Sequence, residues 1–456
     1  MATRRSGRRI GILGHVGNKN LGDEAIIASV IRQIRDRYPD AEISAFTSHP
    51  EDTRERHAIP SFPIRRGDPQ SGSAGTSRPS KLSRLVARIR ATGKAAPWLY
   101  GLLKLVRRSA RLCWGAFAEV RFLAQCHNRL KDIDLLIFAG SNQLNDYCGG
   151  PWIFPYDLLK WCILAKWVGA KVAFLCCGAG PLDSWLGKLF IKCSLSLADY
   201  RSYRDEGSRR LIESIGVAGD NPVCTDLALG LELPHAAQPE SATSRLIVGI
   251  NPLPFCDAHH WPEHNEQIYQ GYVRKLAAFA RWLHERGHSV VFFPTQLRAD
   301  PSVIQDIRRF LKGSGAADLE NPLVDRPIRS LEDLIVSISA MDIVVATRYH
   351  GVVLSVALHR PVLAIAYYGK TGDLMAQVGQ SDYVVDITSF DPNALAERFV
   401  AMESRTQTIR RELAQRTPLL RQALAREYDR VFRLLEEGSR VGAVDEQMAA
   451  LARPNG

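Results

Sequence analysis

The feature that most constrains the fold is an alternation of apolar, strand-like runs with helix-like patterns, which occurs twice along the 456 residues. The expected strands cover residues 9–13, 43–46, 135–138, 171–177 and 200–203 in the first half, and residues 246–250, 289–293, 342–346 and 361–366 in the second. Such alternation is typical of parallel sheets with helices on both faces. We therefore predict an α/β protein in which two Rossmann-like domains face each other across a cleft.

The chain is long enough for two or three domains, and a Pro-, Ala- and Ser-rich stretch at residues 233–244 separates its halves. We expect an N-terminal domain over residues 1–232, which carries a basic amphipathic insertion at about 64–115, and a C-terminal domain over residues 245–390. A helical segment at 391–438 should then cross back over the first domain. Residues 439–456 are expected to form a tail.

The cysteine pattern and the hydropathy of the chain indicate in which cellular compartment the protein is located. The nine cysteines contain no C-x-x-C pair, which indicates reduced thiols and neither a disulfide scaffold nor a zinc site. His259, His260 and His264 lie in a Pro-interrupted stretch, where we expect no metal. No apolar run reaches the roughly 18 residues of a membrane span, and the N-terminal apolar run is too short for a signal peptide. We expect a cytoplasmic protein.

The positive charge of the chain is concentrated in the insertion. The whole sequence carries 59 Lys and Arg against 48 Asp and Glu, and residues 65–111 contain twelve Lys and Arg but a single acid, Asp68. Leu82, Leu85, Val86 and Ile89 have helical spacing in the same segment. A basic amphipathic helix indicates peripheral contact with an anionic membrane. The alternative is a solvated helix packed on its own domain; nucleic acid is not expected, because the rest of the chain is neutral.

The strand expected at residues 342–346 leads directly into charged and aromatic residues. Arg348, Tyr349 and His350 follow it, and Gly351 opens a helix-like pattern. The carboxyl end of a strand beside a helix N-terminus is where open α/β sheets bind anionic ligands. The alternative is that Arg348 pairs with a neighbouring carboxylate and that His350 is a satisfied turn residue.

Two more cations follow expected strands. Arg204 comes directly after residues 200–203, and Lys370 follows residues 361–366. Both would face the same cleft as Arg348, where cations suit a phosphate or a carboxylate. The alternatives are that Arg204 pairs with Asp205 and that Lys370 points into solvent.

The first expected strand ends in a loop with three glycines, Gly14, Gly17 and Gly22. The loop is neither a dinucleotide-binding G-x-G-x-x-G nor a Walker sequence, which argues against NAD and ATP. Asn18 and Asn20 add amide donors that could reach a ligand. Asp23 either caps the following helix or acts on a hydroxyl group as a base.

A polar loop follows the strand expected at residues 135–138. It contains Asn142, Gln143 and Asp146, and Trp152 comes shortly after. Amides, a carboxylate and an aromatic face are the groups that bind sugars. We predict that these four residues line an acceptor site.

Taken together, these motifs resemble the polysaccharide pyruvyl transferase family. The matching stretches are residues 17–25, the loop from Gln143 to Asp146 with residues 150–152, Arg204-Asp205 with Ser208, and Arg348-x-His350-Gly351 followed by Pro361 and Lys370. The chain departs from the family in the triplet 139–141, which is less rich in glycine than usual, and in its insertion.

The resemblance implies a GT-B-like fold and transfer of pyruvate from phosphoenolpyruvate onto two sugar hydroxyls as a ketal. It implies a donor site at Arg204, Arg348 and His350, and the residue types extend that site to Tyr349, Lys370, Asn18 and Asn20. His350 and Asp23 are the candidate catalytic groups. Phosphoenolpyruvate serves as co-substrate, and no metal or organic cofactor is required. The acceptor is a surface polysaccharide or its lipid-linked precursor.

Two other functions are compatible with the same features. One is a GT-B glycosyltransferase that uses a nucleotide sugar, which binding of a nucleotide sugar would favour. The other is a non-catalytic envelope-assembly protein that binds glycan or membrane. The presence of Arg204, Arg348 and His350 argues against the second.

Overall fold

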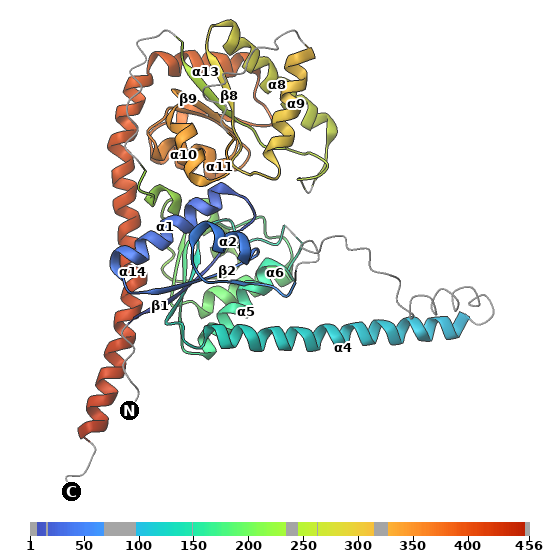
Figure 1. Cartoon of the computed structure of the whole chain (residues 1–456), viewed down its shortest axis with the longest axis vertical. Helices are drawn as coiled ribbons and strands as arrows, with labels where there is room; N and C mark the ends of the chain where they lie inside the picture. Colours follow the sequence, from blue (N-terminus) through green and yellow to red (C-terminus); the bar gives the residue numbers. More distant parts are fainter. Residues whose placement is uncertain are drawn as a thin grey trace.

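Two parallel sheets, one in each half of the chain, form the body of the protein (Figure 1). This architecture comes from a computed structural model that describes residues 7–14, 17–67, 97–147, 149–233, 245–261, 263–313 and 327–451. The helix expected around Leu82 to Ile89 lies outside the described residues. The predicted α/β class with two Rossmann-like halves is confirmed.

The N-terminal sheet has the strand order β3-β2-β1-β4-β5-β6. Its strands are β1 (Arg9–Leu13), β2 (Glu42–Thr47), β3 (Ser61–Pro63), β4 (Leu135–Ala139), β5 (Lys171–Cys177) and β6 (Tyr200–Tyr203). Its helices are α1 (Leu21–Arg37), α2 (Pro50–His57), α4 (Pro97–Leu130), α5 (Phe154–Trp167), α6 (Trp185–Leu197) and α7 (Glu206–Ser214). Ile137 packs into one core and Phe138 into the other, because successive side chains of a strand point to opposite faces. Helices therefore cover both faces.

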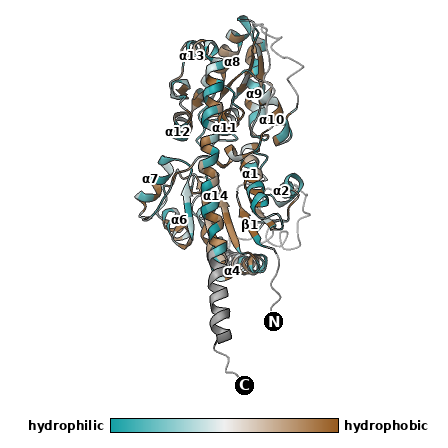
Figure 2. Ribbon diagram, turned by 90° about the vertical axis from the view of Figure 1, so that its left-hand side faces the viewer, coloured by the Kyte–Doolittle hydropathy of each residue, from teal (hydrophilic) through white to brown (hydrophobic). Residues whose placement is uncertain are grey.

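The C-terminal sheet has the order β11-β10-β9-β7-β8. Its strands are β7 (Ile247–Asn251), β8 (Ser289–Phe292), β9 (Ile343–Ala346), β10 (Val362–Ala366) and β11 (Val384–Asp386). Its helices are α8 (Glu266–Glu285), α9 (Asp300–Gly313), α10 (Leu331–Ser339), α11 (Tyr349–Ala357), α12 (Gly369–Gln377) and α13 (Pro392–Ser404). Figure 2 shows hydrophobic residues gathered inside each half and hydrophilic ones on the outer helices.

The long helix α14 (Thr406–Leu451) leaves the C-terminal half and runs along the N-terminal half (Figure 1). Arg37 Nη2 donates to Asp429 Oδ1 at 2.7 Å, and the rings of Tyr38 and Phe432 lie 5.5 Å apart edge to face. The predicted return over the first domain is confirmed. Helix α14 extends to Leu451, past residue 438 where the helical segment was expected to end.

Several local features differ from the sequence-based expectations. Helix α11 begins at Tyr349, with Arg348 at its N-cap, so that His350 lies in the first turn and not before the helix. Cys176 and Cys224 form a disulfide, which corrects the expectation of reduced cysteines. The two residues are separated by 48 positions, and a spacing argument based on neighbouring cysteines does not detect such a pair.

Helix α4 contains residues 97–115 of the basic insertion and projects past the edge of the N-terminal half (Figure 1). Its last turns are anchored in the core by Phe122, Cys126 and Leu130, which are spaced four residues apart on one face. Among the described residues, no helix combines the length and the apolar character needed to cross a membrane.

Candidate functional site

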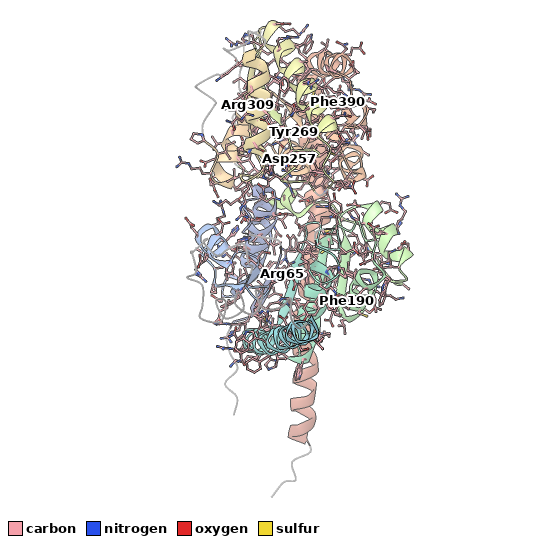
Figure 3. All side chains as sticks on the ribbon, turned by 90° about the vertical axis from the view of Figure 1, so that its right-hand side faces the viewer. Arg65, Phe190, Asp257, Tyr269, Arg309 and Phe390 are labelled. Carbon is pink, nitrogen blue, oxygen red and sulfur yellow. A yellow bond between two sulfur atoms is a disulfide. The ribbon has the colours of Figure 1, made fainter. Side chains whose placement is uncertain are left out.

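A cavity of about 960 Å³ lies between the two halves, at the carboxyl ends of both sheets. Residues that follow β1, β4, β6, β8, β9 and β10 line it, among them Asn18, Ser141, Arg204, Thr295, Arg348 and Tyr367. Figure 3 shows Arg65 in the N-terminal half and Asp257 near the lower edge of the C-terminal half. The cavity is thus at the position where α/β sheets bind ligands.

Backbone contacts between the halves close one side of the cavity. Leu21 N donates to Thr295 O at 2.8 Å, and Leu297 N donates to Lys19 O at 2.9 Å. Arg298 Nη1 also donates to Asn18 Oδ1 at 2.8 Å. The glycine-containing loop after β1 therefore joins the C-terminal half, so the amide oxygen of Asn18 is occupied by protein.

Arg204 is the most deeply placed cation of the cavity, with only 3% of its surface exposed. Its Nη1 donates to Asp226 Oδ2 at 3.4 Å, and its guanidinium lies 4.8 Å from the centre of the Tyr349 ring. Burial opposes its charge, but Tyr349 and Asp226 outweigh that effect and raise the pKa of Arg204. Nε and Nη2 are buried and form no hydrogen bond with the described residues. The pairing with Asp205 that the sequence left open is present as an ion pair, with 3.7 Å between Arg204 Nε and Asp205 Oδ2. Because buried donors are nearly always satisfied, this group is suited to an incoming anion.

Asp226 links Arg204 to His350, and sequence reasoning did not identify it. Cys224 N donates to Tyr203 O at 2.8 Å, which brings the following residues alongside the end of β6. Asp226 Oδ2 lies 3.7 Å from His350 Nε2. Burial alone would raise the pKa of Asp226, but His350 and Arg204 hold it well below its usual range. Asp226 is therefore a buried carboxylate between two basic groups from different halves.

His350 packs directly against the N-terminus of α1. A Cβ atom added to Gly22 would lie 2.2 Å from the imidazole Cγ and Nδ1 of His350. Only glycine leaves room for the ring, which explains why the loop carries a glycine at this position. His350 Nε2 has no hydrogen-bond partner within the described part of the chain, because Asp226 is beyond hydrogen-bond distance.

Arg348 pairs with Asp300, at the first position of α9. Its Nε and Nη2 donate to Asp300 Oδ1 at 2.9 and 2.5 Å, while Asp300 Oδ2 accepts from the backbone N of Thr295 and Gln296. The sequence analysis gave pairing of Arg348 with a carboxylate as an alternative to ligand binding, and the structure contains such a pair. The guanidinium still lines the cavity, so Asp300 fixes its orientation.

Lys370 lies in the first turn of α12 and is surrounded by tyrosines. Its Nζ is 5.1, 5.4 and 5.9 Å from the ring centres of Tyr349, Tyr368 and Tyr367. Burial, and then the positive charge of Arg204, lower the pKa of Lys370 to about 7. The amine is therefore poised to gain a proton when an anion binds nearby. Lys370 lines the cavity, so the alternative that its side chain points into bulk solvent is wrong.

Asn20 and Asp23 form the opening turn of α1. Asn20 caps the helix by accepting from Gly22 N at 3.2 Å, and its Nδ2 donates to Asp23 Oδ2 at 2.7 Å. Burial raises the pKa of Asp23, although His350 and Ser141 partly oppose this. Asp23 is thus not the cap itself. It is a carboxyl group on the cavity wall with a raised affinity for a proton.

Only one of the four predicted acceptor residues, Asn142, lines the cavity. Gln143 is buried and donates to the backbone O of Ala139 and Gly140. Asp146 accepts from Asp183 N and Ser184 N at 3.0 and 2.8 Å. The expectation that Gln143 and Asp146 face the ligand is corrected, because both side chains hold the loop in shape.

Trp152 does not line the cavity either. Its side chain is 62% exposed, and its ring lies 5.5 Å from that of Phe190 on α6. The ring therefore points to the outer surface, although Gly149, Ile153 and Phe154 beside it line the cavity.

Several wall residues were not predicted from the sequence. They are His49, Arg65, Tyr147, His260, Trp261, Arg298, Tyr367 and Tyr368. His260 comes from the histidine-rich stretch, and Asp257 binds its backbone N. The described residues contain no group of three or more His, Cys, Asp or Glu side chains that could hold a metal ion.

The fold defines a GT-B-like protein. It is similar to a putative UDP-N-acetylglucosamine 2-epimerase from Listeria monocytogenes (TM-score 0.52, 8% identity, 95% of this chain and 97% of that chain covered). It is also similar to an alpha,alpha-trehalose 6-phosphate synthase from Burkholderia multivorans (TM-score 0.52, 13% identity, 99% of each chain covered). A search among curated proteins found no match.

The sequence itself matches a family model. The model for polysaccharide pyruvyl transferase covers residues 20–368, a span that includes most of the cavity wall. The chain belongs to the polysaccharide pyruvyl transferase family.

Proposed function

We propose that the cavity binds phosphoenolpyruvate and transfers its pyruvyl group to a sugar as a ketal. The observation that carries this proposal is the buried guanidinium of Arg204, whose Nε and Nη2 have no hydrogen-bond partner among the described residues. Asp226 and Asp205 offset part of the charge of Arg204, but buried N–H donors that form no hydrogen bond cost free energy unless a ligand accepts from them. A small dianionic or trianionic ligand fits that requirement.

The cationic groups match the two anionic ends of phosphoenolpyruvate. Arg204 and Lys370 lie close together beside the N-terminus of α12, which has no side-chain cap, so they are suited to the phosphate. Arg348 is oriented by Asp300 and is suited to the carboxylate. Helix α11 also begins without a side-chain cap, and its free N–H groups add to the positive potential.

His350 is positioned to move protons. In the proposed reaction a proton is added to the enol carbon, and the first sugar hydroxyl bonds to the neighbouring carbon. Phosphate then leaves with the electrons of its C–O bond, and the second hydroxyl attacks the cation that remains. The protons of the two hydroxyls balance the new C–H bond and the hydrogen phosphate. His350 delivers the first proton, and Asp23 accepts one from an acceptor hydroxyl.

The acceptor is a glycan of a surface polysaccharide or its lipid-linked precursor, and the proposed location is the cytoplasm or the inner membrane face. Asn142 and Tyr147 line the cavity from the N-terminal half, whereas Arg348 lines it from the C-terminal half. Amide and phenol groups there suit sugar hydroxyls. Asn20, at the N-cap of α1, lines the same cavity, although its own side chain is engaged with Asp23.

The test is to incubate the protein with phosphoenolpyruvate and glycan acceptors taken from the host's surface polysaccharide. Phosphate release and the product mass are measured together. The proposal expects release only when an acceptor is present, with a product heavier by pyruvate less one water. Transfer of a sugar from a nucleotide sugar, without use of phosphoenolpyruvate, contradicts it.

A further inference from the structure

The outer surface of the N-terminal half carries a group of exposed aromatic side chains. Among the tryptophans whose side chains the structure describes, four are between 62% and 75% exposed, and all four lie between residues 114 and 185. We refer to these exposed side chains together as the tryptophan face, which consists of Trp114, Phe117, Trp152, Trp167, Trp185 and Leu189. Large apolar side chains gathered in this way mark an interaction site.

Three neighbouring helices supply this face. Helix α5 lies between α4 and α6, since Tyr156 of α5 donates to Glu119 of α4 at 3.3 Å and the rings of Tyr156 and Phe190 of α6 lie 6.4 Å apart. Trp167, at the end of α5, lies 5.4 Å from His127 of α4. These contacts place α4, α5 and α6, which carry most of the exposed residues, in one helical layer.

The charge of α4 indicates what this face contacts. The helix contains six Lys and Arg and one acid, Glu119, and that acid is already engaged by Tyr156 and by Lys160 at 3.7 Å. Two copies of the chain that met through this face would bring like charges together across a twofold axis. An anionic surface has the complementary charge, and tryptophan is favoured where apolar and aqueous phases meet.

We propose that the tryptophan face rests on an anionic phospholipid surface. The sequence predicted such contact through residues 65–111, and the face extends it to α5 and α6, which lie outside that segment. The face also adjoins the cavity, because Phe154 at the start of α5 lines the cavity wall. This part of the inference rests on the proposed function: if the cavity transfers pyruvate to a sugar, the acceptor is a glycan anchored in the lipid layer that the tryptophan face contacts.

The experiment is co-sedimentation of the full chain with vesicles of phosphatidylglycerol and phosphatidylcholine, and with vesicles of phosphatidylcholine alone. The test variant combines Trp114→Ala, Trp167→Ala and Trp185→Ala. The control combines Ile268→Ala, Val336→Ala and Leu419→Ala, which are also exposed apolar residues. The test variant should partition into anionic vesicles roughly tenfold or more weakly, and the control should bind like the wild type.

Equal binding of the wild type and the test variant to anionic vesicles contradicts the proposal, as does absence of wild-type binding. Sedimentation velocity of the same proteins adds a second criterion. If the wild type is a dimer that the test variant dissociates, the face is an interface between copies and the proposal is wrong. None of these measurements requires catalysis, so a negative result for membrane binding is distinguishable from a negative result for pyruvyl transfer. If transfer is observed, a lipid-anchored acceptor in vesicles should be used faster by the wild type than by the test variant.

Discussion

His350 Nε2 lies 3.7 Å from Asp226 Oδ2, and the two residues belong to different halves of the protein. His350 lines the cavity, and Asp226 behind it also accepts a hydrogen bond from Arg204. The site is therefore complete only when both sheets are in their observed positions. Substitutions at single residues of this site should therefore change turnover and donor affinity to different degrees, so that the two roles can be measured separately.

His350→Gln should separate turnover from donor binding. Glutamine keeps hydrogen-bonding groups but cannot carry a proton, so turnover should fall by roughly 10² to 10⁴ while phosphoenolpyruvate binding changes little. Phosphate release and calorimetric titration measure the two quantities. His284→Gln on α8, away from the cavity, is the control. A parallel loss of binding and turnover shows that His350 holds the donor and does not move its proton.

Arg348→Lys should weaken donor binding. Lysine keeps the charge but loses the planar fork that Asp300 orients through Nε and Nη2, so affinity for phosphoenolpyruvate should fall by about 1.5 to 3 kcal/mol. Arg309→Lys changes an exposed pair with Asp306 and should have no effect. Calorimetric titration at fixed salt gives both affinities. Unchanged binding in Arg348→Lys removes Arg348 from the donor site.

Donor affinity should fall as the pH rises through about 7. The pKa of Lys370 is lowered to about 7, so the amine is charged below this pH and neutral above it, and an anion prefers the charged form. The loss should be roughly tenfold by pH 8.5, and proton uptake should accompany binding near pH 7.5. Lys370→Met should abolish this pH dependence, whereas Lys312→Met on α9 should retain it. A wild-type affinity that does not change between pH 6 and 8.5 contradicts this role.

Gly22→Ala should disturb the contact between the halves. The added Cβ would lie 2.2 Å from the His350 ring, so the ring must move or the halves must separate. We expect a stability loss of about 1 to 3 kcal/mol, typical of overpacking, together with reduced turnover. Gly271→Ala on α8 is the control, because nothing lies within 4 Å of its added Cβ. Denaturant unfolding and phosphate release measure both effects, and a fully active Gly22→Ala protein would mean that this contact has no functional role.

The strands were predictable where apolar runs are long. Strands β5 and β9 are buried apolar runs, followed by Gly178 and by Thr347-Arg348, and they lie where the sequence predicts them. Strands β3 and β11 have three residues each, which is too short for a periodic pattern. Their pairing depends on the neighbouring strand and not on their own sequence.

The cations of the site were predictable, but the carboxylates that hold them were not. Arg204 and Arg348 follow strands directly, so their position can be inferred from the sequence. Asp300 is 48 residues from Arg348, and Asp226 reaches Arg204 only because a segment after α7 returns to β6. Gln143 and Asp146 show the opposite error, since polar loop residues were taken as ligand contacts although backbone groups occupy them.

Calorimetric titration of phosphoenolpyruvate and of UDP-N-acetylglucosamine into the wild type and into Arg204→Lys tests the central claim most directly. Lysine at position 204 removes the Nε and Nη2 donors, which form no hydrogen bond with the described residues, and keeps a positive charge. We expect the wild type to bind phosphoenolpyruvate, the variant to bind it at least roughly tenfold more weakly, and neither protein to bind the nucleotide sugar. A wild-type protein that binds the nucleotide sugar but not phosphoenolpyruvate would contradict the proposed function.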